Sequence, residues 1–272
     1  MAQQPQGKHM EVKHMGDSDK KRRATILKGV FVVLLLVAVG CGGYVLYMNH
    51  LEQQRAEEMS ATGKPATKVE SKGKELPDNP IDFAPLIQEN ADIYAWLYIP
   101  GADINTPLLQ STTDDLFYLD HDKDGKYDPY GTAFSQMANA RDFSDPVTVV
   151  YGHVNGGVFH NLHNFEDADF FNENTEFFIY TPGHILKYKI VSAYQYDDRH
   201  ILNSFNFADP AVRQDYFNSV CNPDALLKNV RDGVTLDADS KIVQLSTCMS
   251  DTNHTTSRYI VTGVLIDDQP TY

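Results

Sequence analysis

Residues 241–267 read KIVQLSTCMSDTNHTTSRYIVTGVLID and contain two strand patterns separated by a polar stretch. Lys241–Cys248 and Arg258–Asp267 are rich in apolar and β-branched residues, which favours β-strands. A short polar loop between two such strands favours antiparallel pairing. We therefore predict that Cys248 and Arg258 lie close together, at the same end of two neighbouring strands.

Short strand patterns of the same kind occur earlier, separated by turn residues such as Pro100-Gly101. Helices are fewer. Asp82–Asn90 has apolar residues on one face, Asp209-Pro210 is typical of a helix start, and Asp224–Val230 resembles a further helical turn. The predicted strands are Trp96–Ile99, Ile104–Leu109, Thr132–Ser135, Val147–Tyr151, Phe177–Tyr180 and Leu186–Tyr196. This order predicts a mainly β fold with inserted helices, as a closed or nearly closed barrel.

An apolar segment precedes this domain. Gly29–Met48 is a run of 20 residues without a charge, and at the helical rise it measures about 30 Å, the thickness of a bilayer's hydrocarbon core. We predict a transmembrane signal-anchor over residues 29–48. A cleaved signal peptide and lipid attachment at Cys41 are alternatives, but the apolar run continues past Cys41, beyond an ordinary signal-peptide core.

Basic residues lie on one side of the segment. Five precede it closely, whereas Asn49–Glu58 contains only Arg55. The positive-inside rule then predicts a single-pass protein of the cell membrane with residues 1–28 in the cytoplasm and the rest outside. Residues 49–79 contain no aromatic residue and are predicted to be a flexible linker. Residues 80–272 suit one domain.

The charge of the chain limits its partners. The whole chain has 23 Lys and Arg and 37 Asp and Glu, and residues 1–48 hold seven of the basic and three of the acidic ones, which leaves a net charge of −18 for residues 49–272. Such an acidic body disfavours a nucleic-acid partner, since phosphate backbones are bound through clustered Lys and Arg. Three Cys residues are too few for a disulfide scaffold.

Cys248 is the first candidate for chemistry, because it ends an apolar strand outside the membrane, where an unpaired thiol is unusual. A buried structural Cys and a disulfide with Cys221 are alternatives. A guanidinium such as that of Arg258 can favour a thiolate and can hold an oxyanion. His153 also follows a buried strand, after one Gly. His160 and His163 have no further ligands at metal spacing, so no metal is expected.

These residues resemble three motifs of the sortases, membrane-anchored cysteine transpeptidases of Gram-positive bacteria. LSTC ending at Cys248 matches the nucleophile motif, YGH ending at His153 the histidine motif, and SRYIV containing Arg258 the arginine motif. The stretch 81–110, the segment YLDHD at 118–122 and the helix before the last two strands resemble class B. The resemblance covers about residues 80–272.

The resemblance implies an eight-stranded sortase-type β-barrel without a cofactor. Its substrates would be secreted proteins with a C-terminal sorting signal. Cys248 would attack the carbonyl after the signal's Thr, and an amine of a peptidoglycan precursor would resolve the thioacyl enzyme. His153 would be the general acid and base, and Arg258 would stabilise the oxyanion or the substrate backbone. Thr247 would line the substrate groove, and Asp115, where some members have Asn, would contact substrate.

Two other functions are considered. One is a pilin polymerase, in which the amine is a Lys side chain of another subunit. The other is a membrane-tethered adhesion or binding module with a structural Cys248. Reaction of Cys248 with a thiol reagent in the folded protein separates this module from an enzyme.

Asp120–Asp128 reads DHDKDGKYD and copies most of a calcium loop, with acids at positions 1, 3, 5 and 9 and Gly125 at position 6. The twelfth position, where a bidentate Glu is expected, is Gly131. A turn between strands explains Asp and Gly equally well. We therefore expect no specific calcium requirement.

Overall fold

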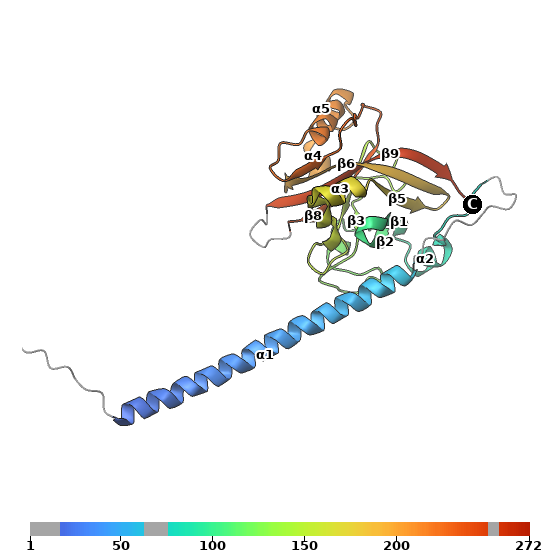
Figure 1. Cartoon of the computed structure of the whole chain (residues 1–272). Coiled ribbons are helices and arrows are strands. Elements are labelled where there is room, and N and C mark those ends of the chain that lie inside the picture. The colour runs from blue at the N-terminus through green and yellow to red at the C-terminus, as the bar shows by residue number, and fades with distance from the viewer. Residues whose placement is uncertain (1–16, 63–75, 250–255) are drawn as a thin grey trace, which may run out of the picture. The chain divides into compact units, whose positions relative to one another are not determined.

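The computed structural model describes residues 17–62, 76–249 and 256–272. The chain divides into two compact units, Met1–Gln54 and Arg55–Tyr272. Helix α1 (Asp17–Thr62) is the long helix of Figure 1.

Within the described residues, α1 is the one helix long and apolar enough to cross a membrane, over Thr25–Tyr44 with a mean hydropathy of 2.3. The domain limits at residues 28, 48 and 79 stay predictions. Helix α1 continues to Thr62, into the segment predicted as a linker, and residues 63–75 lie outside the described residues.

The second unit contains nine strands among its described residues. They are β1 (Ile93–Ile99), β2 (Ile104–Leu109), β3 (Phe134–Ser135), β4 (Val147–Tyr151), β5 (Glu176–Thr181), β6 (His184–Asp197), β7 (Lys228–Val230), β8 (Ile242–Cys248) and β9 (Ser257–Pro270). The α-helices are α2 (Phe83–Glu89), α3 (Ala168–Glu173), α4 (Ile201–Ser204) and α5 (Pro210–Cys221), and the 3₁₀ helices are η1 (Pro100–Ala102), η2 (Phe117–Leu119) and η3 (His160–Glu166).

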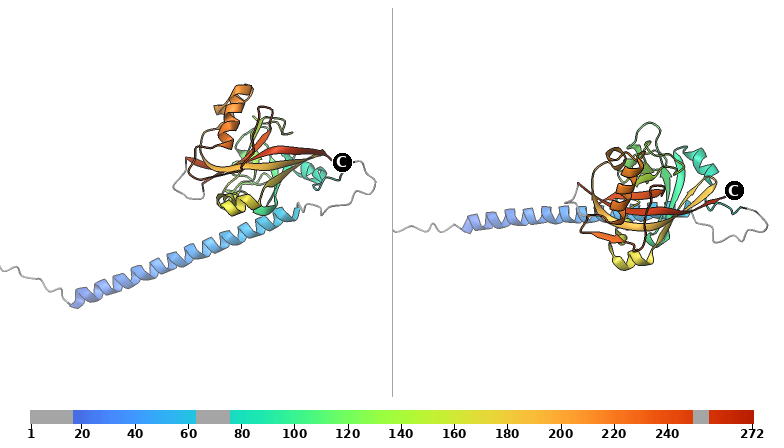
Figure 2. Two further views of the ribbon diagram at one scale, coloured as in Figure 1. Left: turned by 45° about the horizontal axis from the view of Figure 1, so that its top comes forward. Right: turned by 90° about the horizontal axis from the view of Figure 1, so that it is seen from above.

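Eight of these strands close into a barrel. Their hydrogen-bonded order is β5-β1-β2-β3-β4-β8-β9-β6, and β6 pairs again with β5, so the ring has no free edge. Strand β7 pairs with β6 outside the ring. The predicted eight-stranded barrel is confirmed, and Figure 2 shows the long strands β6 and β9 side by side across it.

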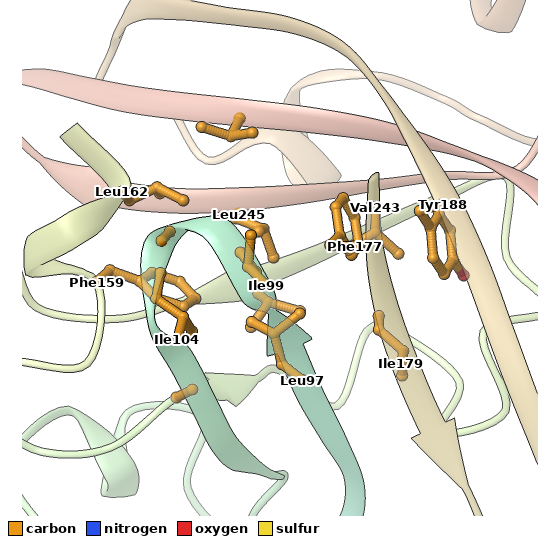
Figure 3. Packing of buried hydrophobic residues seen from close by; sticks show 14 of the residues in the cluster. Leu97, Ile99, Ile104, Phe159, Leu162, Phe177, Ile179, Tyr188, Val243 and Leu245 are labelled. Carbon is orange, nitrogen blue, oxygen red and sulfur yellow. The ribbon is translucent and has the colours of Figure 1, made fainter. Parts of the chain in front are cut away.

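Alternating side chains divide each strand between the barrel interior and an outer layer. On β8, Val243 and Leu245 belong to the interior cluster, whereas Ile242 belongs to an outer cluster under α5. Figure 3 shows that Phe159 and Leu162 enter the interior cluster beside these residues. The segment that contains η3 is therefore fixed to the barrel by buried side chains.

Capping residues explain where the helices begin. Asp82 accepts a hydrogen bond from the amide of Ala84 at the start of α2, and Asp209 accepts one from Ala211 at the start of α5. Both predicted starts are confirmed. The predicted helical turn over Asp224–Val230 is wrong, because its last residues form β7 along β6. Pairing along an existing strand satisfies their backbone groups better than an isolated turn.

Candidate active site

Cys248 ends β8, and His153 follows β4, the strand that runs parallel to it. In the pairing of β4 with β8, Tyr151 lies beside Ser246, and the amide of Gly152 donates to the carbonyl of Ser246 at 3.2 Å. His153 and Cys248 each follow this pair by two residues. Because the carboxyl ends of parallel strands meet at one edge, the two residues lie at the same edge of the barrel wall.

Arg258 lies directly across from Cys248. The two residues are partners in the antiparallel register of β8 and β9, as the sequence predicted, and Tyr196 of β6 is the next partner of Arg258. Directly opposed residues in antiparallel strands project to the same face. The guanidinium and the thiol therefore share the outer face of the barrel, and Arg258 donates from Nη1 to the carbonyl of Ser257 at 3.1 Å.

A cavity of about 260 Å³ lies over this face, and His153, Cys248 and Arg258 all line it. The end of β6 and the turn into α4 form one wall, and η2 with the residues beside it forms another. In the described part of the chain, the cavity therefore brings together the three residues that the sequence motifs indicated.

The surrounding backbone holds His153. Its Nε2 lies 2.8 Å from the carbonyl oxygen of Leu119, and its own carbonyl accepts from the amide of Phe159 at 3.0 Å. A Cβ atom at Gly157 would lie 2.4 Å from the carbonyl oxygen of His153, so only Gly allows this close approach. Gly131, with a φ of 54°, allows the same kind of approach to Leu119. The position of the imidazole thus depends on two loops.

The structure decides between the alternatives for Cys248. The side chain is exposed and the thiol is free, as is that of Cys221, so the buried structural Cys and the disulfide are both wrong. Burial raises the pKa of the Cys221 thiol. Because the thiolate is the reactive form, Cys221 is a poor nucleophile at neutral pH.

We expect Cys221→Ala to leave peptide cleavage within about twofold of the wild type, because Cys221 packs at the end of α5 and is absent from the cavity lining. The measurement is kcat/KM together with the thermal midpoint. A loss of cleavage without a loss of folded protein would contradict the packing role.

The two predicted substrate-binding residues lie in different surroundings. Thr247 lines the cavity, and among the described residues its buried hydroxyl oxygen has no hydrogen-bond partner. The carboxylate of Asp115 accepts from the amide of Met137 at 2.7 Å, which joins the η2 loop to the chain after β3. The cavity lining does not include Asp115. Substrate binding by either residue stays a prediction.

The wall at the end of β6 has no signal in the sequence motifs. Tyr196, Asp197, Arg199 and His200 line the cavity, and Arg199 pairs with the carboxylate of Asp197. These residues belong to none of the three motifs, and only the register with β9 brings them beside Arg258. Tyr151 is a further lining residue, and its burial raises the pKa of its phenol to about 12.

The calcium-like loop uses its acids internally. Asp122 Oδ1 accepts from the amides of Asp124 and Lys126, both at 2.9 Å, and Asp128 Oδ1 accepts from Tyr130 at 3.1 Å. Lys123 donates to Asp124 at 2.7 Å and thereby lowers the pKa of that carboxyl. Gly125 has a φ of 75°. These contacts are typical of a tight turn.

We expect activity to be similar in a chelator and in millimolar calcium, because these carboxylates already bind their own loop. The measurement is the initial rate of peptide cleavage in each buffer. A several-fold stimulation by calcium that disappears in Asp122→Ala would show that this interpretation is wrong.

Comparisons with known proteins agree with the motifs. Residues 97–266, more than half of the chain, match the family model described as the Sortase domain. A sortase B of Listeria monocytogenes is 25% identical over 251 residues, which cover 90% of this chain and 99% of the relative.

Solved structures agree as well. A class B sortase of Streptococcus pyogenes involved in pilus biogenesis is 29% identical with a TM-score of 0.58, over 68% of this chain and 98% of that one. Sortase B of Clostridium perfringens is 27% identical with a TM-score of 0.59, over 68% of this chain and 100% of that one.

Proposed function

The chain belongs to the sortase family and is a class B cysteine transpeptidase, and we propose that it cleaves the C-terminal sorting signal of secreted proteins after Thr and transfers the protein to a cell-wall amine. The exposed thiol of Cys248, in one cavity with His153 and Arg258, carries this proposal. Membership of the family excludes the adhesion module with a structural Cys.

The reaction has two acyl transfers. The thiolate of Cys248 attacks the carbonyl carbon of Thr, and the tetrahedral intermediate expels the amine of the next residue, which takes a proton from His153. A thioester to Cys248 remains. The acceptor amine gives a proton to His153 as it attacks this thioester, and Cys248 leaves as the thiolate. Arg258, across the strand pair from the thiol, offers its guanidinium to the oxyanion in both steps.

We further propose that α1 anchors the enzyme in the cell membrane by a single pass. Its apolar span and the five basic residues before Gly29 support a cytoplasmic N-terminus. The catalytic domain then lies outside the cell, where sorting signals and peptidoglycan precursors are accessible. A protease that cannot enter intact cells is expected to remove the domain and leave residues 1–28 protected.

The acceptor amine is the point on which the second candidate function differs. The similar S. pyogenes sortase is involved in pilus biogenesis, which supports a pilin polymerase as the alternative. In that case the amine is a Lys side chain of another subunit. The two functions share the thioacyl step and differ only in the second transfer.

One experiment tests both candidates. Cell-wall fragments are analysed by mass spectrometry from cells with and without the gene, and from cells that carry Cys248→Ala. We expect gene-dependent fragments that end in Thr joined to a peptidoglycan amine. Fragments with Thr joined to a Lys side chain support the pilin polymerase. The absence of any gene-dependent Thr linkage contradicts both.

A further inference from the structure

A second histidine lies beside the nucleophile. His163 is on η3, and its Nε2 lies 2.9 Å from the carbonyl oxygen of Cys248. Its Nδ1 lies 2.5 Å from Oε1 of Glu166 on the same helix. The side chain of His163 is 11% exposed. Both ring nitrogens therefore have partners in a largely buried setting.

These two partners determine what His163 can do. A carbonyl oxygen only accepts hydrogen bonds, so Nε2 donates to Cys248, and Nδ1 shares a hydrogen bond with the carboxyl group of Glu166. Because the protein engages both ring nitrogens, neither nitrogen is free to take a proton from a substrate. The contacts of His163 thus favour a role in positioning over acid–base chemistry.

The ring is held at the strand end that carries the nucleophile. It stacks on Tyr259, with ring centroids 4.8 Å apart and an interplanar angle of 23°. Tyr259 is fully buried, follows Arg258 and pairs with Thr247 across β8 and β9. His163 thus contacts the backbone of Cys248 and the residue next to Arg258.

The helix that carries His163 is itself fixed on two sides. Leu162 is buried in the barrel interior, as Figure 3 shows. Asn229 of β7 donates from Nδ2 to the carbonyl oxygens of Phe165 and Glu166, at 2.8 and 3.0 Å. A continuous set of contacts therefore runs from β7 through η3 and Glu166 to His163 and the carbonyl of Cys248.

We propose that His163, oriented by Glu166, is a positioning residue that fixes the backbone of Cys248 for attack on the substrate. The inference rests on the proposed function, because it concerns the nucleophile of that reaction. A nucleophile must approach its carbon within about 3–3.5 Å, and a displacement of about 1 Å can lower the rate roughly 100-fold. The carbonyl and the thiol belong to the same residue. Loss of the hydrogen bond between His163 and this carbonyl would therefore let the reacting sulfur move.

Two substitutions at one position test this role. His163→Leu keeps a similar side-chain volume and removes both hydrogen-bonding nitrogens, and we expect kcat to fall roughly 10- to 100-fold with little change in KM. His163→Gln keeps a donor at a reach similar to that of Nε2, and we expect it to retain kcat within about threefold of the wild type. The folded fraction of each variant is measured by thermal unfolding, so that kcat refers to folded enzyme only.

A double variant tests the orienting role of Glu166. Because Glu166 acts through His163, adding Glu166→Ala to His163→Leu should lower kcat by no more than about twofold further. His184→Leu is the matched control, since His184 Nδ1 pairs with Asp268 at 2.7 Å on the opposite end of β6 from Tyr196. It should leave kcat unchanged. Wild-type kcat in His163→Leu, or an equal loss in His163→Gln, overturns the inference.

A measurement without substrate separates this inference from the proposed function. Amide hydrogen exchange over residues 244–249 should quicken in His163→Leu and stay near the wild-type rate in His163→Gln. Unchanged exchange in His163→Leu overturns the inference even if no peptide is cleaved. Failure of the wild-type enzyme to cleave any sorting-signal peptide, with exchange altered as expected, contradicts only the proposed substrate.

Discussion

Cys248→Ala should abolish cleavage of a sorting-signal peptide, with a fall in kcat of roughly 10⁴-fold or more, because it removes the only atom proposed to form the thioester. The side chain is exposed at the end of β8, so its loss leaves no cavity in the core. Stability should change by no more than about 0.5 kcal/mol. The measurements are peptide cleavage followed by chromatography and thermal unfolding of the same samples.

The control for this substitution is Cys221→Ala, the same chemical change at the end of α5. A mass shift of the acyl-enzyme should appear on the wild type and on Cys221→Ala when the acceptor amine is left out, and should be absent from Cys248→Ala. Full activity in Cys248→Ala would end the proposed mechanism. Inactivity together with loss of the folded state would assign Cys248 to the fold.

Arg258→Lys should lower kcat roughly 100-fold and leave KM within a few-fold, because Lys keeps the charge but loses the planar fork of donors. The register places Arg258 between Cys248 and Tyr196, so its guanidinium faces the cavity where the oxyanion forms. The Lys side chain is shorter and ends in a single nitrogen, so it cannot direct two parallel N–H donors at one oxyanion as the guanidinium does. Steady-state kinetics of peptide cleavage measure both constants.

Arg213→Lys is the matched control for Arg258. Arg213 donates to the carbonyl oxygens of Ala238 and Phe207, and it does not line the cavity. This variant should lose stability without losing turnover per folded site, in contrast to Arg258→Lys. An effect of Arg258→Lys on KM alone would contradict the oxyanion role and would assign Arg258 to binding of the substrate backbone.

Much of the local structure could be predicted because it depends on neighbouring residues. Strands β2 and β4 begin and end where their apolar runs do, between turn residues. Helix α5 begins after Asp209, whose carboxylate caps it. Strand β7 was missed because its few residues have no strand pattern of their own. Pairing with β6, far away in the sequence, determines their structure.

The candidate site was predictable in its parts but not in its arrangement. The register of Cys248 with Arg258 followed from a short loop between neighbouring strands, which leaves few ways to pair them. No local rule pairs β4 with β8, which are separated in the sequence by β5, β6, α5 and β7. That parallel pairing alone brings His153 to the edge where Cys248 lies.

Local residue patterns account for most of the strands and helices, for the apolar span of α1, and for the motifs of Cys248, His153 and Arg258. Closure of the barrel decided the rest, because long-range pairing depends on how all strands satisfy their edges together. Closure left Cys248 free of Cys221 and placed the carbonyl of Leu119 against His153. It also set His163, which no motif marked, against the carbonyl of the nucleophile.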